Sequence, residues 1–513
     1  MSLKIAVIGA GVSGLVACKE LLATGLEVSV FEKGENVGGI WAYSEDPDTP
    51  SVMRQTVLNL SKAQMAFSDF PFPDDCPDYA THQAYEKYLK SYASHFDLLQ
   101  HIRFGTAVTT VTPLAHGRWK VVSQSSATSA TKEEIFDRVV VSAGQNQIPN
   151  MPKTPGLDVF KGEVLHSRNY KSFEPFMGKR VLVVGVANSG ADVAVDLSGN
   201  AEKVLLSGRR GIWLLPRFLL MGKPLDHLMS RKSFGFPSWV TNMFMRFMSR
   251  LMVGDMSRFG LGTNINPTSI NPTVNDHLGE RLATGKIKAH PDIARLHEGE
   301  VEFVDGTREK IDAIIYCTGY QRSFPFLPSL AMTGQASPNS PTLSLYKRIV
   351  PIAYPGLAFV GHIHGLAHSA VAEMQARWVA RLFAGDLKLP AETGMQDEID
   401  SHALWVKHNI HGGVSTCEVP PFPYMELLAK DIGCNVDTRA LWWNRPVLLC
   451  LFKNITLYDI IDDRLEKWPC VIMIYFALPF KVYGFRRSYD GTLEVETFEF
   501  DRYTDKLEEM QFA

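Results

Sequence analysis

Two glycine-rich segments of this chain carry residue types that can hold the phosphates of a dinucleotide. The first contains Gly9, Gly11 and Gly14 in a GxGxxG pattern. In this pattern the first glycine allows a tight turn, the second lets the backbone approach a pyrophosphate, and the third lets helix and strand pack closely. The N-terminus of the following helix offers N–H groups and partial positive charge to the phosphates. Val12 and Ser13, between the glycines, are further candidate contacts.

The residues around this motif predict a strand, a helix and a second strand. Lys4 to Ile8 is an apolar run, apolar residues then recur at helical spacing, and EVSVFE ends in Glu32. A carboxylate at that place can accept hydrogen bonds from a ribose diol, as in an adenine dinucleotide site. Trp41 could cover a flat ring or belong to the core, and both interpretations stay open. The candidate contacts that follow Glu32 are Lys33, Gly39, Ile40 and Trp41.

The second glycine-rich segment repeats the plan with one departure. Gly185 and Gly190 keep the outer positions, and Ala187 replaces the middle glycine, which gives GxAxxG. Asn188 and Ser189 begin the predicted helix and are candidate contacts for a phosphate.

The strand after this second helix is followed by basic rather than acidic residues. About twenty residues past the glycines, where an NAD site has an acid, stand Ser207, Arg209 and Arg210. A hydroxyl and two guanidinium groups would bind a ribose phosphate that an acid would repel. We therefore expect FAD at the first site, beside Glu32, and NADPH at the second.

A third pattern lies between the two nucleotide segments. FKGEVLHSRNY places Phe160, Gly162, His166 and Tyr170 in the order FxGxxxHxxxY, after a Pro- and Gly-rich stretch typical of a crossover. We expect His166 to hold the crossover against the second domain, and direct proton transfer to a flavin is the alternative role.

These motifs together resemble the flavin-containing monooxygenases, a family of class B flavoprotein monooxygenases. The fingerprint FxGxxxHxxxY is theirs, and Tyr170 points to the branch that oxidises heteroatoms, since the related Baeyer–Villiger enzymes typically carry Trp there. LNLSKAQMAFSDFPFP is similar to the family segment whose Asn meets the flavin. Carried over by resemblance, the further flavin contacts are Asn59, Ser61, Val108 and Gln375.

The resemblance implies an α/β fold with two nested Rossmann-like dinucleotide-binding domains and a helical insertion. The FAD domain would be discontinuous, built from residues 1–155 and 310–435. The NADPH domain would cover 156–309, with the insertion at about 213–274. Residues 436–513 would form a C-terminal extension.

The implied activity is an NADPH- and O2-dependent oxygenation of a small molecule. NADPH reduces FAD, the reduced flavin and oxygen form a flavin hydroperoxide, and one oxygen atom passes to a soft nucleophilic nitrogen or sulfur. The cofactor supplies the chemistry, so neither a nucleophilic side chain nor a metal is expected. Asn59 is assigned the catalytic polar contact. Baeyer–Villiger oxygenation of ketones or aldehydes by the same intermediate is the alternative.

Composition excludes several other classes. With 52 Lys and Arg against 55 Asp and Glu, the net charge of −3 argues against a nucleic-acid partner. The seven cysteines form no CxxC pair, which argues against a flavin disulfide reductase. A non-catalytic sensor that binds both cofactors is a remaining rival. We expect a cytoplasmic protein, because no signal peptide or membrane span is apparent.

The insertion contains a further pattern, SWVTNMFMRFMSRLM, in which apolar residues recur every four positions from Trp239 to Met252. This predicts an amphipathic helix that packs on the protein's own core. A substrate-entry lid and a peripheral contact with the cytosolic face of an internal membrane are the alternatives. The partners expected are an amine or sulfide substrate and molecular oxygen, and a homodimer is left open.

Overall fold

The protein is seen here in a computed structural model that describes residues 2–146, 148–219, 222–229, 231–327, 343–412 and 417–434. Beyond these, the backbone of two strands is described, β21 (Lys481–Arg487) and β22 (Leu493–Glu499), which pair antiparallel. The remainder of the predicted extension at 436–513 lies outside the described residues.

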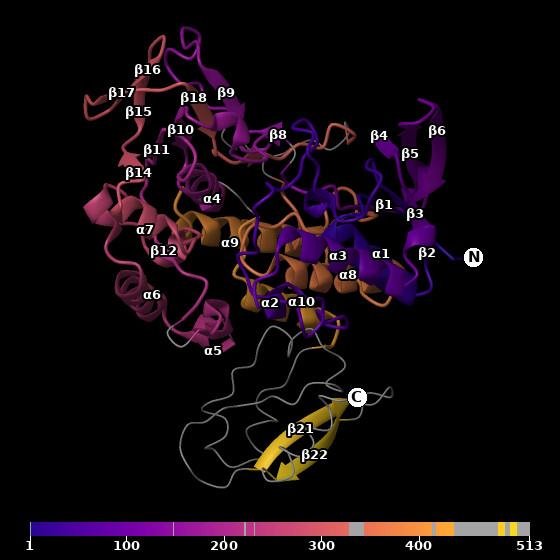
Figure 1. Cartoon of the computed structure of the whole chain (residues 1–513). Coiled ribbons are helices and arrows are strands. Elements are labelled where there is room, and N and C mark those ends of the chain that lie inside the picture. Colours follow the sequence, from indigo (N-terminus) through magenta and orange to yellow (C-terminus); the bar gives the residue numbers. More distant parts are fainter. Residues whose placement is uncertain are drawn as a thin grey trace.

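A parallel five-stranded sheet forms the first nucleotide fold. Its strand order is β20-β7-β1-β2-β3, so the N-terminal strand lies at the centre. The strands are β1 (Lys4–Ile8), β2 (Glu27–Phe31), β3 (Ile102–Arg103), β7 (Arg138–Val141) and β20 (Leu357–Phe359). Three antiparallel strands adjoin it, β4 (Thr106–Pro113), β5 (Trp119–Ser125) and β6 (Thr131–Phe136) (Figure 1).

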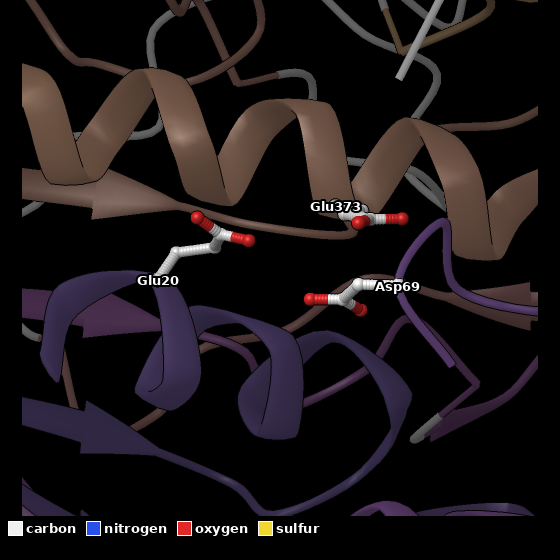
Figure 2. Close-up of side chains that lie close together, drawn as sticks. All are labelled: Glu20, Asp69 and Glu373. Atoms are coloured by element: carbon white, nitrogen blue, oxygen red, sulfur yellow. The ribbon is translucent and has the colours of Figure 1, made fainter. Parts of the chain in front are cut away.

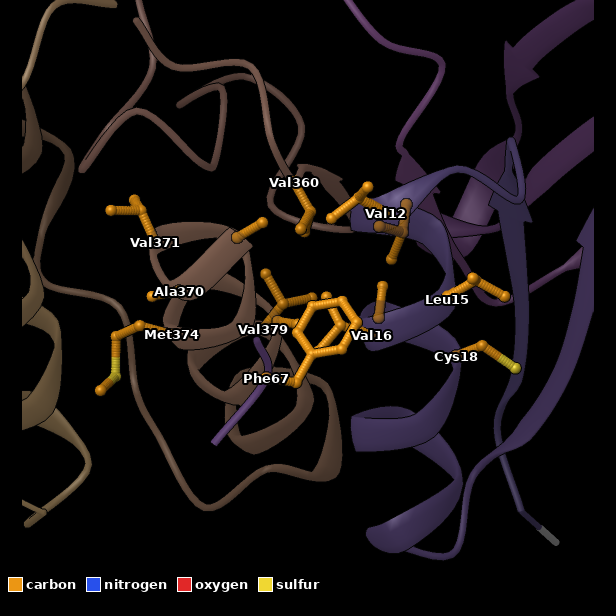
Figure 3. Close-up of a cluster of buried hydrophobic side chains, with 14 of the residues drawn as sticks. Val12, Leu15, Val16, Cys18, Phe67, Val360, Ala370, Val371, Met374 and Val379 are labelled. Atoms are coloured by element: carbon orange, nitrogen blue, oxygen red, sulfur yellow. The ribbon is translucent and has the colours of Figure 1, made fainter. Parts of the chain in front are cut away.

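The main hydrophobic core lies between the first sheet and the helices that pack on it. Helix α1 (Val12–Ala23) packs along α8 (His368–Ala384), although more than 300 residues of sequence separate them. Figure 3 shows their facing side chains, with Phe67 inserted from a loop. The remaining helices around this core are α2 (Lys62–Met65), α3 (His82–His95), α9 (Glu392–Asn409) and α10 (Pro421–Asp431).

A second parallel sheet of five strands has the order β14-β11-β10-β18-β9. Its strands are β9 (Glu163–His166), β10 (Arg180–Val184), β11 (Lys203–Ser207), β14 (Ile287–His290) and β18 (Ala313–Tyr316). Its helices are α4 (Asn188–Leu197) and α7 (Leu278–Ala283), and an antiparallel sheet of β15 (Ile293–Leu296), β16 (Glu300–Phe303) and β17 (Arg308–Lys310) adjoins it. Two Rossmann-like folds on one chain confirm the predicted fold class.

One predicted boundary needs correction. Strand β18 pairs with β10 and β9, so it belongs to the second sheet and not to the flavin domain, which we had expected to resume at residue 310. The chain returns after β18, through β19 (Tyr320–Gln321), which pairs with β8 (Ile148–Pro149) on the outgoing crossover. The apolar sequence of β18 predicts a buried strand, but it does not show which of the two sheets that strand joins.

The insertion contains short elements and one long helix. Strands β12 (Leu214–Leu215) and β13 (Thr273–Val274) pair in parallel, and between them lie α5 (Arg231–Gly235) and α6 (Ser238–Met252). Helix α6 lies at the outer edge of the molecule in Figure 1. No helix among the residues that the structure describes is long and apolar enough to cross a bilayer.

Helix α6 presents its apolar stripe outward, which contradicts the expectation that it packs on the core. Trp239 is 68% exposed, Met243 60% and Phe247 59%. The buried residues of the helix are instead polar. Asn242 accepts from the backbone N–H of Thr268 at 2.9 Å, and the hydroxyl of Ser249 donates to the carbonyl of Leu214 at 2.8 Å. The spacing of four correctly predicts which residues share the apolar face of the helix. It does not show whether that face contacts the core or solvent.

The fingerprint between the two nucleotide folds holds the crossover together. His166 ends β9, and its Nδ1 accepts from the backbone N–H of Arg168 at 3.1 Å. Its Nε2 therefore carries the proton and donates to the carbonyl of Gly319 at 3.0 Å. Burial lowers the pKa of His166, which keeps the ring neutral. Both nitrogens are engaged, so the geometry supports the holding role rather than proton transfer.

The other three fingerprint residues have packing roles. The hydroxyl of Tyr170 donates to Asp196 on α4 at 2.6 Å, which ties the fingerprint to the second nucleotide helix. Phe160 is buried in the core of the second fold. At Gly162 an added Cβ would lie 2.3 Å from the ring of Phe160 and 2.4 Å from the carbonyl oxygen of Asp312. Only glycine fits between this ring and this backbone.

We therefore predict that Gly162→Ala destabilises the protein by about 1–3 kcal/mol, because the ring or the neighbouring strand must move to admit the methyl group. Chemical denaturation of the two forms, followed by tryptophan fluorescence, measures the difference. Gly299→Ala is the matched control, since an added Cβ there meets nothing within 4 Å. Equal effects of both substitutions would contradict the assigned packing role.

Candidate cofactor and active site

The first glycine loop forms a phosphate cradle at the N-terminus of α1. Gly9 has φ +100°, a conformation that L side chains rarely adopt. A Cβ on Gly14 would lie 1.8 Å from the carbonyl oxygen of Gly9, so the helix approaches the loop more closely than any side chain permits. No side chain caps α1 and no acid stands in its first turn, which includes Val12 and Ser13. The first-turn N–H groups are thus suited to a pyrophosphate.

Glu32 is fixed at the end of β2, where a ribose would lie. Its Oε2 accepts from the backbone N–H of Ala10 at 2.7 Å, and its Oε1 accepts from that of Gly34 at 2.8 Å. A carboxylate has about four lone-pair sites, so two remain for a diol. Lys33 beside it is exposed. The N–H groups at the start of α1 and the Glu32 carboxylate therefore fit the phosphates and the ribose of an adenine dinucleotide.

The loop after β2 closes against the glycine loop. A Cβ on Gly39 would lie 3.2 Å from the Cα of Gly11, which brings two backbone segments together beside the cradle. Ile40 and Trp41 are half-buried. The indole of Trp41 meets the ring of Tyr85 edge-on at a centroid distance of 4.9 Å and packs against the main core. Trp41 thus packs against the core and is also partly exposed.

Two residues that the resemblance assigned to the flavin are too deeply buried to contact it. Gln375 is 0% exposed, accepts from the backbone N–H of Gly361 at 2.8 Å and donates to the hydroxyl of Tyr424 at 2.8 Å. Ser61 is 1% exposed, and its backbone N–H donates to Asp226 at 2.6 Å. Direct contact with FAD is therefore corrected to a supporting role for both. Val108 is half-buried on β4 and packs beside the first sheet.

Asn59 lies on the loop that precedes α2 and is half-buried. Its side-chain oxygen accepts from Nη2 of Arg217 at 3.0 Å. The insertion thus contributes a residue to the predicted active-site loop, and Asp226, which binds Ser61, is a second such residue. Sequence reasoning missed both, because nothing in their spacing links them to a loop more than 150 positions away.

The second glycine loop repeats the cradle. Helix α4 begins after Ala187 without a side-chain cap, and a Cβ on Gly190 would lie 1.8 Å from the carbonyl oxygen of Gly185. Asn188 already accepts from the backbone N–H of Val274 at 2.8 Å, whereas Ser189 is exposed. The N–H groups at this helix start are again suited to a phosphate.

Of the three residues predicted to bind a ribose phosphate, one is excluded. Ser207 is 1% exposed, and its hydroxyl donates to the carbonyl of Pro291 at 2.7 Å, so it stabilises the strand end instead. Arg209 and Arg210 follow on the exposed loop after β11. The nearest acid to Arg209 is Asp292, at 3.9 Å, a separation at which an exposed ion pair contributes little. The two arginines are thus placed to receive a phosphate.

A buried charge network joins the helices behind the flavin cradle. Glu20 of α1, Asp69 and Glu373 of α8 approach one another in Figure 2. Lys19 contacts Glu20 at 2.8 Å and Asp69 at 2.5 Å, and Arg377 contacts Glu373 at 3.0 Å. Burial raises the pKa of Glu373 to about 7. Lys19 and Arg377 pair with all three acids, so the cluster connects α1 to α8 through ion pairs.

Comparison with known proteins agrees with this geometry. The chain matches the family model described as flavin-binding monooxygenase-like over residues 2–456. It is 36% identical over 462 residues to a flavin-containing monooxygenase 5 of Oryctolagus cuniculus, covering 87% of this chain and 85% of the relative. It is also 36% identical over 468 residues to a dimethylaniline monooxygenase [N-oxide-forming] 2 of Pan troglodytes, covering 87% and 86%.

Solved structures share the fold. An S-allyl-L-cysteine S-oxygenase from Allium sativum superposes with a TM-score of 0.65 at 24% identity, covering 90% of this chain and 96% of that one. A cyclohexanone monooxygenase superposes with a TM-score of 0.64 at 17% identity, covering 84% and 98%. With two uncapped nucleotide cradles, an acid beside one and arginines beside the other, the chain belongs to the flavin-containing monooxygenase family and is an oxidoreductase that uses FAD and NADPH.

Proposed function

We propose that this enzyme transfers one oxygen atom to a soft nucleophilic nitrogen or sulfur of a small molecule. The relative from Pan troglodytes, named for N-oxide formation, is 36% identical over nearly the whole chain and carries this proposal. The Asn59 carboxamide and two nucleotide cradles supply the groups that such a reaction needs from the protein. Baeyer–Villiger oxygenation is the second candidate, because the cyclohexanone monooxygenase fold superposes over 84% of this chain.

Bound FAD, reduced by NADPH, supplies the oxygen-activating chemistry. The cradle at α1 would hold the FAD pyrophosphate and Glu32 its ribose. Arg209 and Arg210 would select NADPH through its ribose phosphate. Asn59 would present a neutral hydrogen-bond donor where oxygen is transferred, and a neutral group adds no charge that would repel an anionic oxygen.

We predict that the purified enzyme is yellow and converts a tertiary amine and a thioether to their oxides with about one product per NADPH. In Asn59→Asp, product per NADPH should fall about tenfold or more while NADPH is still consumed. The introduced carboxylate would destabilise negative charge on the oxygen to be transferred. Product analysis by mass spectrometry, alongside NADPH absorbance, measures this ratio.

Asn200→Asp is the control, because it adds the same charge at an exposed position near the far end of α4. Unchanged oxygenation by Asn59→Asp would overturn the role of Asn59. Conversion of a ketone to an ester or lactone in preference to both heteroatom substrates would establish the Baeyer–Villiger alternative.

A second prediction concerns coenzyme choice. Replacing both Arg209 and Arg210 by alanine should raise the KM for NADPH about 10- to 100-fold, because a charge-assisted hydrogen bond contributes about 1.5–3 kcal/mol. The KM for NADH should change little, since NADH lacks the phosphate. Steady-state kinetics with both coenzymes test this. The exposed Arg118, on the hairpin between β4 and β5, supplies the control Arg118→Ala, and equal losses for both coenzymes would argue against phosphate recognition.

We also propose that α6 rests on the surface of a membrane. Its outward face consists of large apolar side chains, with Phe236 just before the helix at 58% exposed, and its last turn carries the exposed Arg250. Apolar side chains that enter the lipid boundary and a basic residue near the headgroups are what an interfacial helix requires. This would place the enzyme in the cytoplasm, peripherally on an internal membrane.

We predict that the enzyme floats with vesicles containing phosphatidylserine and that Trp239→Ser with Phe247→Ser weakens binding at least about tenfold, because burying each ring contributes about 1.5–3 kcal/mol. Leu404→Ser is the control, since this residue is similarly exposed but lies on α9. If the enzyme does not float, and sedimentation shows a dimer that the same two substitutions separate, a second copy covers this face instead.

A further inference from the structure

The loop that carries Asn59 is held by an arginine from the insertion. Arg217 is 9% exposed and follows strand β12 by two residues. Its Nε donates to the carbonyl of Leu58 at 3.0 Å, and its Nη2 donates to Oδ1 of Asn59 at 3.0 Å. One guanidinium therefore fixes both the backbone and the side chain of the predicted active-site loop.

A carboxylate fixes this arginine in turn. Asp276 accepts from Nη1 of Arg217 at 2.8 Å and from its backbone N–H at 2.8 Å. The pairing follows from the register of β12 and β13, because Leu215 lies opposite Val274 and each charged residue stands two positions further on. The carbonyl of Arg217 also accepts from the hydroxyl of Tyr79. Every end of the residue is thus anchored.

This contact decides which way the Asn59 amide faces. A guanidinium has only donors, so the atom of Asn59 that lies against Arg217 must be the oxygen. The amide nitrogen, with its two N–H donors, must then point to the opposite side. Among the residues that the structure describes, no hydrogen bond engages that nitrogen. Without Arg217 the amide could rotate by half a turn and present an acceptor instead.

We propose that Arg217, held by Asp276, is a positioning residue for oxygen transfer, because it keeps the N–H donors of Asn59 directed toward the reacting oxygen. The proposal rests on the proposed function of Asn59. It also gives the insertion a part in the active site, which its sequence does not suggest.

The test compares Arg217→Met, Arg217→Lys and Asn59→Ala in the FAD-loaded enzyme. Arg217→Met should lower product per NADPH about tenfold while FAD content and the KM for NADPH stay within about twofold. Arg217→Lys keeps one donor and should recover part of the ratio. In the double variant with Asn59→Ala, the loss of product per NADPH should not exceed that of Asn59→Ala alone. Both changes remove the same feature, the Asn59 amide held in one orientation by Arg217.

A measurement without turnover gives an independent answer. The decreases in melting temperature caused by Arg217→Met and Asn59→Ala should not add in the double variant, since both remove the same hydrogen bond. Arg348→Met is the control for a lost buried arginine, because Arg348 is similarly buried and pairs with Glu398 elsewhere. It should lower the melting temperature yet leave product per NADPH unchanged.

The outcomes separate the two proposals. If Asn59→Ala lowers product per NADPH and Arg217→Met does not, the positioning role is overturned and the role of Asn59 stands. If neither lowers it, Asn59 has no catalytic contact and Arg217 has nothing to position. If Arg348→Met lowers the ratio as much as Arg217→Met, the effect is one of general stability and the positioning role is also overturned.

Discussion

The structure depends on a double crossing of the chain between two parallel sheets. The outgoing and returning segments pair as β8 and β19, and side chains tie them further. Asn150 donates to the carbonyl of Thr318 at 3.2 Å, and the hydroxyl of Thr318 donates to the carbonyl of Asn150 at 2.6 Å. With His166 bound to Gly319 at the same place, the two nucleotide cradles are kept on one rigid junction. This junction would hold two bound dinucleotides in fixed relative positions, which a transfer between them would require.

The crossing also explains why the fingerprint has its spacing. On either side of β9 and at its end, the pattern places Phe160 in the core of the second fold, His166 at the junction and Tyr170 at α4. Tyr170 is buried and donates to Asp196, so its hydroxyl anchors the second nucleotide helix, α4. A tryptophan at that position would lack this hydroxyl. In this chain the role of Tyr170 is therefore packing and hydrogen bonding to the second nucleotide helix.

The sequence predicts well wherever one short segment decides its own structure. The glycine motifs, the strand and helix around each of them, and α6 all formed where their patterns placed them. It fails where two distant segments compete for one polar group. Ser207 and Gln375 have the residue types that a ligand would need, but Pro291, Gly361 and Tyr424 already use their hydrogen-bonding atoms. No spacing rule reveals such partners, and the same limitation concealed Arg217.

The insertion physically connects an outward-facing helix to the loop that carries Asn59. Ser249 of α6 donates to the carbonyl of Leu214, which lies in β12, and Arg217 lies two residues beyond the end of that strand. The helix therefore rests through its polar face on the strand that delivers the arginine to Asn59. An ordinary amphipathic helix would use its apolar face for such support and would have nothing left for an external surface. By holding α6 through hydrogen bonds, this chain leaves the apolar face exposed, while Arg217, just beyond the same strand, pairs with Asp276 and bonds the loop that carries Asn59.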